Sequence, residues 1–229
     1  MPEVAYVAPF LAETTLRFVA ALGRLEGTGL SLVSQDPVDR LPDALRPLVD
    51  EYVQVRDALD PGVILRALDE LQRRGRRVES VLGTFEELQV PLGRVRDELG
   101  LPGMRAEAAE NFRDKARMKE VLRAHGLPCA RHALARSPDE LRAFVAAAGL
   151  PVIVKPPAGS GSRGTFRLGS EADVAEFLDG MPPSPESPTL IEEFVVGEEH
   201  SFDAMSLDGR VVWHSISHYY PSALEALRA

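Results

Sequence analysis

A lysine that closes an apolar strand is the first residue of this sequence that could do chemistry. Residues 151–156 read PVIVKP, which predicts a buried strand ending at Lys155. An ammonium group in such a place needs an anionic partner, because burying it unpaired is costly. By this argument alone, phosphate oxygens and a structural Asp or Glu are equally good partners.

The loop after Lys155 is rich in glycine and serine, and it could bind phosphate oxygens through backbone N–H groups and hydroxyls. Its candidate phosphate-binding residues are Gly159, Ser160, Gly161, Ser162, Arg163 and Gly164. The guanidinium of Arg163 adds a planar fork of donors. A plain hairpin turn between strands at 152–156 and 165–168 is the alternative, and the G-x-x-x-x-G-K-[ST] pattern of Walker loops is absent.

An acidic segment farther along the chain, TLIEEFVVGEEHSFD at 189–203, completes the pattern. Neighbouring residues of a strand point to opposite faces, so only one of Glu192 and Glu193 can enter a cleft. Glu199 lies beyond Gly197, where its carboxylate could accept hydrogen bonds from ribose hydroxyls, and a solvated acidic edge is the alternative. Together with the lysine and the loop, this segment predicts half of a clamp for ATP.

Composition and charge exclude several other classes of protein. The chain has 229 residues, 45% of them apolar, which allows one or two domains with a full core. Its net charge is −9, and the basic run 73–77 falls at a helix end, so nucleic-acid binding is not predicted. Cys129 is the single cysteine, which excludes a disulfide framework and fits a reducing cytoplasm. No long apolar run or signal-like N-terminus indicates a membrane.

The first hundred residues alternate between strand and helix patterns, which predicts a parallel sheet with right-handed crossovers. The expected strands are 4–8, 30–33, 51–55 and 77–82, and the expected helices are 13–25, 43–48 and 61–74. The loop after the first strand reads PFLA instead of G-x-G-x-x-G, so dinucleotide binding is not predicted. Glu86 and Glu87 follow the last strand, where they could meet a substrate amine or simply the start of a helix.

A break at LGLPG, residues 99–103, marks the expected boundary between two domains. One long helix is expected over 109–125, with Lys115 near its start. Strands at 129–135 and 190–195, a helix capped by Ser137 and a further helix at 170–178 are expected after it.

A β-hairpin is predicted near the end of the sequence, because Asp208-Gly209 forms a typical turn between two segments with strand patterns. By the period of two, His214 and His218 share one face of the second strand. A third metal ligand is not apparent, so we expect polar edge histidines and no metal site here. On the first strand, one face carries Glu199, Ser201 and Asp203.

In their order along the chain, these motifs resemble those of the ATP-grasp family of carboxylate–amine ligases. The matching motifs are LGLPG, RDK-x-x-M-K-x-x-L, HGLP, P-x-I-V-K-P, GSGSRG and EEF-x-x-G-x-E-x-S-x-D, and they cover almost the whole chain. The loop GSGSRGT is most similar to the branch of L-amino-acid ligases and carbamoyl-phosphate-synthetase-like enzymes, and less similar to biotin carboxylases.

The resemblance implies an α/β fold that is incomplete at the C-terminus. A parallel, Rossmann-like pre-ATP-grasp domain is expected at 1–100 and an α+β ATP-grasp domain at 101–229. The second domain would comprise a helical connector at 101–128, an ATP-binding subdomain at 129–200 and the start of a C-terminal subdomain at 201–229.

The resemblance also implies residue roles. Phosphates would be contacted by Lys115 and Lys155 under a closing loop at 159–164, and Lys155 and Arg163 would act catalytically by offsetting the charge that develops there. Adenine would be held by Glu192 with the backbone of Glu193 and Val195, and the ribose by Glu199. Family members place their magnesium ligands, an acidic residue and a Glu-x-Asn, on later strands. This sequence contains no Glu-x-Asn, so no metal ligand is assigned.

The leading hypothesis is a cytoplasmic ligase that uses ATP and Mg²⁺ to activate a small carboxylate as an acyl phosphate, which an amine then attacks to form a C–N bond. In that case the 229 residues are a piece of a longer enzyme and are inactive alone. One alternative is a nucleotide-binding regulatory module without catalysis, and another is bicarbonate activation as in biotin carboxylase. The identity of the acid and amine and the oligomeric state, with a homodimer as one option, stay open.

Overall fold

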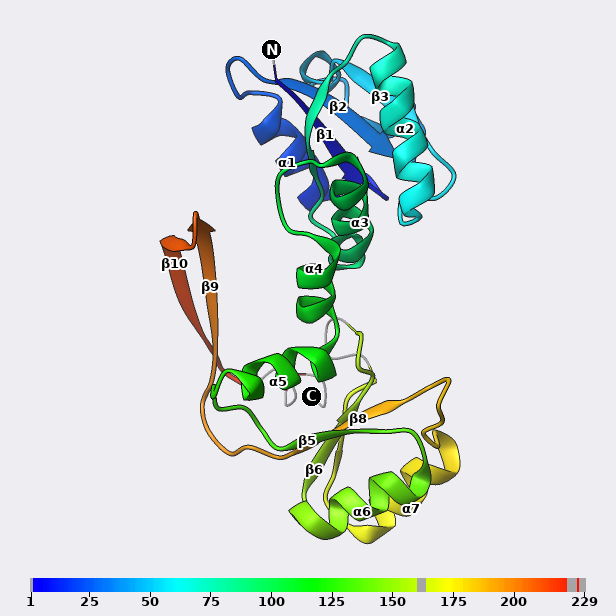
Figure 1. The fold of residues 1–229 in the computed structure, drawn as a ribbon, viewed down its shortest axis with the longest axis vertical. Coiled ribbons are helices and arrows are strands. Elements are labelled where there is room, and N and C mark those ends of the chain that lie inside the picture. The colour runs from blue at the N-terminus through cyan, green and yellow to red at the C-terminus, as the bar shows by residue number, and fades with distance from the viewer. Residues whose placement is uncertain (1, 160–163, 222–225, 227–229) are drawn as a thin grey trace. The chain divides into compact units, whose positions relative to one another are not determined.

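The computed structural model describes residues 2–159, 164–221 and 226, and it divides the chain into two compact units (Figure 1). The units are Met1–Met118 and Lys119–Ala229, and each is described by itself. Their boundary falls inside 101–128, the stretch that the sequence predicts to be a connector. None of the described helices is long and apolar enough to span a bilayer.

The first unit contains a four-stranded parallel sheet in the order β3-β2-β1-β4. Its strands are β1 (Glu3–Ala8), β2 (Gly29–Ser34), β3 (Glu51–Gln54) and β4 (Val78–Leu82). The two central strands, β1 and β2, are almost entirely buried, as expected of parallel strands covered on both faces. The parallel sheet predicted from the strand–helix alternation is therefore confirmed.

Helices cover both faces of this sheet and form two apolar cores (Figure 1). α1 (Glu13–Leu22) packs through Val19 against one face, and α2 (Pro61–Arg73) and α3 (Gln89–Leu99) pack against the other. The predicted N-cap of α2 is present, since Asp60 accepts a hydrogen bond from Val63 N at 2.9 Å. Three short 3₁₀ turns complete the unit: Val38–Arg40, Arg46–Leu48 and Glu86–Leu88.

The single long helix predicted over 109–125 is wrong, because the structure has two helices there. α4 (Ala106–Arg113) and α5 (Lys115–Ala124) are separated by Asp114, whose backbone is extended at φ −93 and ψ 111. The Asp114 carboxylate accepts hydrogen bonds from the backbone of Ala116 and Arg117, which satisfies the first amides of α5. The apolar periodicity continued through a residue that caps a new helix, and that capping was missed. α4 lies close to α3 because Gly93 has no side chain: a Cβ there would be 2.7 Å from Ala106 Cα.

The second unit contains a four-stranded antiparallel sheet in the order β5-β8-β6-β7. Its strands are β5 (His132–Ala135), β6 (Val152–Lys155), β7 (Phe166–Leu168) and β8 (Thr189–Glu193). α6 (Pro138–Ala148) and α7 (Glu171–Gly180) form one apolar core with the sheet. The predicted cap at Ser137 is present, and Ser170 in addition forms a full capping box with Asp173.

A hairpin of two long strands, β9 (Glu199–Leu207) and β10 (Arg210–Tyr219), follows the sheet in the sequence. The predicted turn is confirmed, with positive φ angles at both Asp208 and Gly209. Among the described strands, β9 and β10 pair only with each other. Many of their apolar side chains are exposed, including Phe202, Trp213 and Ile216.

Candidate functional site

A buried carboxylate joins two lysines on one face of the second unit's sheet. Glu192 Oε2 lies 2.7 Å from Lys155 Nζ, and Glu192 Oε1 lies 3.1 Å from Lys119 Nζ. The side chain of Glu192 is 8% exposed, whereas those of Lys155 and Lys119 are 22% and 15% exposed. The sequence left a phosphate and a structural carboxylate open as the partner of Lys155, and in this structure the carboxylate of Glu192 is paired with it.

Strand register explains why these groups meet. Ile153 of β6 lies opposite Glu192 of β8, and Lys155 lies two residues beyond Ile153 on the same face. The alternate residues Val152 and Val154 belong to the apolar core with α6 and α7. The Lys155–Glu192 pair therefore lies on the face of the sheet that these helices do not cover.

This face carries more positive than negative charge. Two ammonium groups share the single Glu192 carboxylate, and Glu192 Oε1 accepts no hydrogen bond from the described residues, so its contact with Lys119 is an ion pair only. His132, opposite Glu192 on β5, has its pKa lowered by burial, and the charges of Arg123 and Lys119 lower it further. A neutral His132 can accept a hydrogen bond from Arg123, whose guanidinium lies 3.0 Å from Nδ1.

Glu193 lies on the opposite face of β8 and is held by Arg131. Its carboxylate accepts hydrogen bonds from the Arg131 backbone at 2.8 Å and from the Arg131 guanidinium at 2.6 Å. The backbone bond, followed by the side-chain bond, lowers the pKa of Glu193. This side chain joins β8 to the segment before β5, so only its backbone is left for the ligand contact that the resemblance implies.

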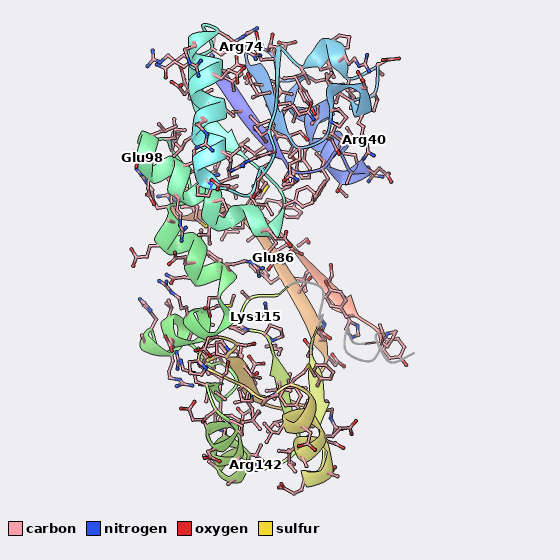
Figure 2. All side chains as sticks on the ribbon, turned by 90° about the vertical axis from the view of Figure 1, so that its right-hand side faces the viewer. Arg40, Arg74, Glu86, Glu98, Lys115 and Arg142 are labelled. Atoms are coloured by element: carbon pink, nitrogen blue, oxygen red, sulfur yellow. The ribbon has the colours of Figure 1, made fainter. Side chains whose placement is uncertain are left out.

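The other predicted site residues lie on separate segments. Lys115 is the first residue of α5 (Figure 2) and belongs to the first unit. Val195 follows β8 and is 65% exposed, and Glu199 begins β9. Of the predicted site residues, Lys155 and Glu192 form a direct ion pair.

The glycine-rich loop is described only at its two ends. Gly159 and Gly164 lie within the described residues, and Ser160, Gly161, Ser162 and Arg163 lie outside them. Gly164 has φ +70, and a Cβ at this position would lie 3.2 Å from the Pro156 ring. The position therefore favours glycine for two independent reasons. The loop does join an antiparallel pair, β6 and β7, as the hairpin interpretation predicts.

Lys119 is the residue that the sequence interpretation missed. It follows Lys115 by four positions, so the two lie on the same side of α5. The composition held a clue: the chain has only three lysines, Lys115, Lys119 and Lys155, and all its other formal cations are arginines.

In the first unit, Glu86, which was weighed as a substrate contact, is paired with Arg113 at 2.9 Å.

Comparisons with known proteins agree with the motifs. No protein-family model matches the chain. The chain is 27% identical to the L-arginine-specific L-amino acid ligase of Bacillus subtilis over 78% of its own length and 44% of the relative. It is 26% identical to the carbamoyl phosphate synthase large chain of a Mycobacterium species (strain JLS) over 86% of its own length and 19% of the relative.

Solved structures show the same fold. An L-amino acid ligase from Bacillus licheniformis superposes with a TM-score of 0.68 at 19% identity, covering 95% of this chain and 50% of that one. N5-carboxyaminoimidazole synthetase from Staphylococcus aureus, solved with ADP, superposes with a TM-score of 0.70 at 14% identity, covering 95% and 54%. The resemblance to ATP-grasp ligases and the α/β fold that it implies are thus confirmed. The chain spans about half of these structures and 19% to 44% of the two curated relatives.

Proposed function

We propose that this chain is the ATP-binding part of a cytoplasmic ligase that activates a carboxylate as an acyl phosphate for attack by an amine. The observation that carries the proposal is the cluster of Lys119, Glu192 and Lys155. Two ammonium groups around one carboxylate leave an excess of one positive charge on a partly exposed face. A phosphate group of ATP would supply the missing negative charge and accept charge-assisted hydrogen bonds.

Glu192 would have two tasks in this site. Its carboxylate holds both lysines in place before the ligand arrives, so little side-chain entropy is lost on binding. Its buried Oε1 has spare acceptor capacity within the described residues, which supports a hydrogen bond from a ligand donor such as an adenine amino group. The backbone of Glu193, the last residue of β8, and of Val195, which follows the strand, would contact the adenine ring edge.

The remaining roles follow the family resemblance. Glu199 would bind the ribose hydroxyls, Lys115 would add a second phosphate contact, and the loop 159–164 would close over the triphosphate. Lys155 and Arg163 would offset the negative charge that develops during phosphoryl transfer, which requires positioning and charge neutralisation more than covalent chemistry.

Magnesium is expected to accompany ATP, and it would supply additional neutralisation of phosphate charge. The donor set of this chain does not fit the family's magnesium site, because the sequence contains a single asparagine, Asn111, and no Glu-x-Asn. We therefore route no step through the metal. A nucleotide-binding regulatory module that does not hydrolyse ATP is the second candidate function.

Turnover distinguishes the two candidates. The protein that contains this chain is incubated with ATP, Mg²⁺ and a panel of carboxylates and amines, and ADP is measured. The ligase hypothesis predicts ADP formation only when the correct carboxylate is present, and its loss in Lys155→Ala. ATP binding without ADP formation under all these conditions would favour the regulatory module, and normal turnover in Lys155→Ala would refute the role of this lysine.

A further inference from the structure

Three side chains that could bind a metal ion, and that the proposed nucleotide site does not use, lie on the β9–β10 hairpin and on the residue just before it. Figure 1 shows the hairpin. Glu198, His200 and His218 each offer one ligand atom, and these atoms lie within 4.8 Å of one another. All three side chains are exposed. Within the described residues, no other group of three His, Cys, Asp or Glu side chains meets this condition.

Strand pairing fixes the positions of these residues. His200 lies directly opposite His218 in the antiparallel register, and their rings stack with centroids 4.6 Å apart and planes 15° apart. Glu198 precedes His200 by two residues and lies on the same side of the chain. The sequence analysis places His214 and His218 on one face of their strand, and the register adds His200 from the opposite strand as the directly facing partner of His218.

The cluster is separate from the face assigned to the nucleotide. Alternation along β9 places Glu199 on the face opposite His200. On the cluster's own face, His214 lies farther along β10 and stacks on Phe202, with ring centroids 5.5 Å apart. His214 thus shares the strand and the face of His218 without belonging to the cluster.

We propose that Glu198, His200 and His218 bind one divalent transition-metal ion, with Zn²⁺ as the ion that this donor set favours. Two imidazoles and one carboxylate suit Zn²⁺, whereas Mg²⁺ and Ca²⁺ prefer oxygen ligands throughout. Ligand atoms about 2.0–2.1 Å from a tetrahedral ion lie about 3.3 Å from one another. The exposed side chains reach this spacing by tilting out of the stack, and a fourth position is left for water or another ligand.

The fold gives the ion a role. An isolated two-stranded ribbon is marginally stable in water, and β9 and β10 pair with no other described strand. The cluster lies at the open end of the hairpin, next to the Glu199–Tyr219 pair and far along the ribbon from the Asp208-Gly209 turn. An ion at this end joins the two strands where the turn does not hold them, and it stabilises the ribbon through binding.

Titration of the untagged 229-residue chain with Zn²⁺, followed by calorimetry, tests the site, and the visible absorption of Co²⁺ reports the ligand set. We expect one ion per chain and retention of Zn²⁺ in excess Mg²⁺. Mutating a residue that hydrogen-bonds to a metal ligand typically lowers the affinity for the metal 10–100-fold. Removing a ligand itself, as in His200→Ala or His218→Ala, should therefore lower the affinity for Zn²⁺ about 100-fold or more. Glu198→Gln should also weaken binding, and hydrogen exchange of the hairpin should slow when Zn²⁺ is added.

His214→Ala is the matched control and should bind Zn²⁺ as the unmodified chain does. Far-ultraviolet circular dichroism of each variant shows whether it remains folded, and the exposure of the three residues makes unfolding by these changes unexpected. The proposal is overturned if the chain binds no Zn²⁺, if Mg²⁺ displaces the ion, or if His214→Ala loses as much affinity as His200→Ala.

Discussion

Replacing Glu192 by glutamine should destabilise the second unit more than any single surface change. Glu192→Gln keeps the shape of the side chain and removes its charge, which leaves Lys119 and Lys155 facing each other without a counter-ion. At an effective dielectric constant of about 20, the Coulomb attraction is about 6 kcal/mol for the Lys155 pair at 2.7 Å and about 5 kcal/mol for the Lys119 pair at 3.1 Å. Desolvation offsets most of this attraction, and we expect a net loss of about 3 kcal/mol.

The assay should be local, because the chain has two units. Hydrogen exchange followed by mass spectrometry on peptides that cover β6 and β8 measures the opening free energy of this sheet. We expect faster exchange in both peptides of Glu192→Gln and unchanged exchange in peptides from the first unit. In a Lys155→Met background the same change should cost less, because fewer cations are left uncompensated. Unchanged exchange of β6 and β8 in Glu192→Gln would refute the view that this carboxylate organises the sheet.

Three other changes test the local physical arguments. Asp114→Ala should destabilise the first turn of α5 by about 1 kcal/mol in urea unfolding, because two backbone N–H groups lose their acceptor, whereas Asp114→Asn should cost less. Gly164→Ala should lower the free energy of unfolding by about 1–2 kcal/mol, because the residue has φ +70 and the new Cβ would press on Pro156. The control is Gly180→Ala, at the end of α7, which should be near neutral because no atom lies within 4 Å of the new Cβ. The folded-state pKa of Glu193 is lowered from its ordinary value of 4.5, so its contribution to stability should be present above that pH and be lost as the pH falls through the folded pKa. Compared with Glu193→Gln in urea unfolding, the unmodified chain should therefore lose its advantage in acid, and an advantage that grows in acid would contradict the assignment.

Periodicity and capping residues predicted most of the fold. The strands of both sheets, the caps at Asp60 and Ser137 and the turn at Asp208-Gly209 depend on local chemistry that a single sequence carries. The break at Asp114 was missed because Lys115 to Ala124 continues an apolar pattern that a capping aspartate does not interrupt.

The partners within the candidate site were harder to predict. Lys155 was identified as needing an anion, but its pairing with Glu192 depends on the register between β6 and β8, two strands that residues 156–188 separate in the sequence. Lys119 had no role assigned from the sequence, and only the tertiary placement of α5 brings it to Glu192. In the same way, the His200–His218 pair depends on cross-strand register, whereas spacing along one strand shows only that His214 and His218 share a face.

Calorimetric titration with ATP tests the central claim, that Lys119 and Lys155 around Glu192 bind the phosphates of a nucleotide. The comparison uses the unmodified chain, Lys119→Met, Lys155→Met and the control Arg142→Met. Arg142 is an exposed residue of α6, the helix that packs on the other face of the sheet (Figure 2). Because a hydrogen bond to a charged group is worth about 1.5–3 kcal/mol, each lysine variant should bind ATP about 10- to 100-fold more weakly, and the control should bind it unchanged. ATP affinity that is the same in all four proteins, or no binding to the unmodified chain, would contradict the account.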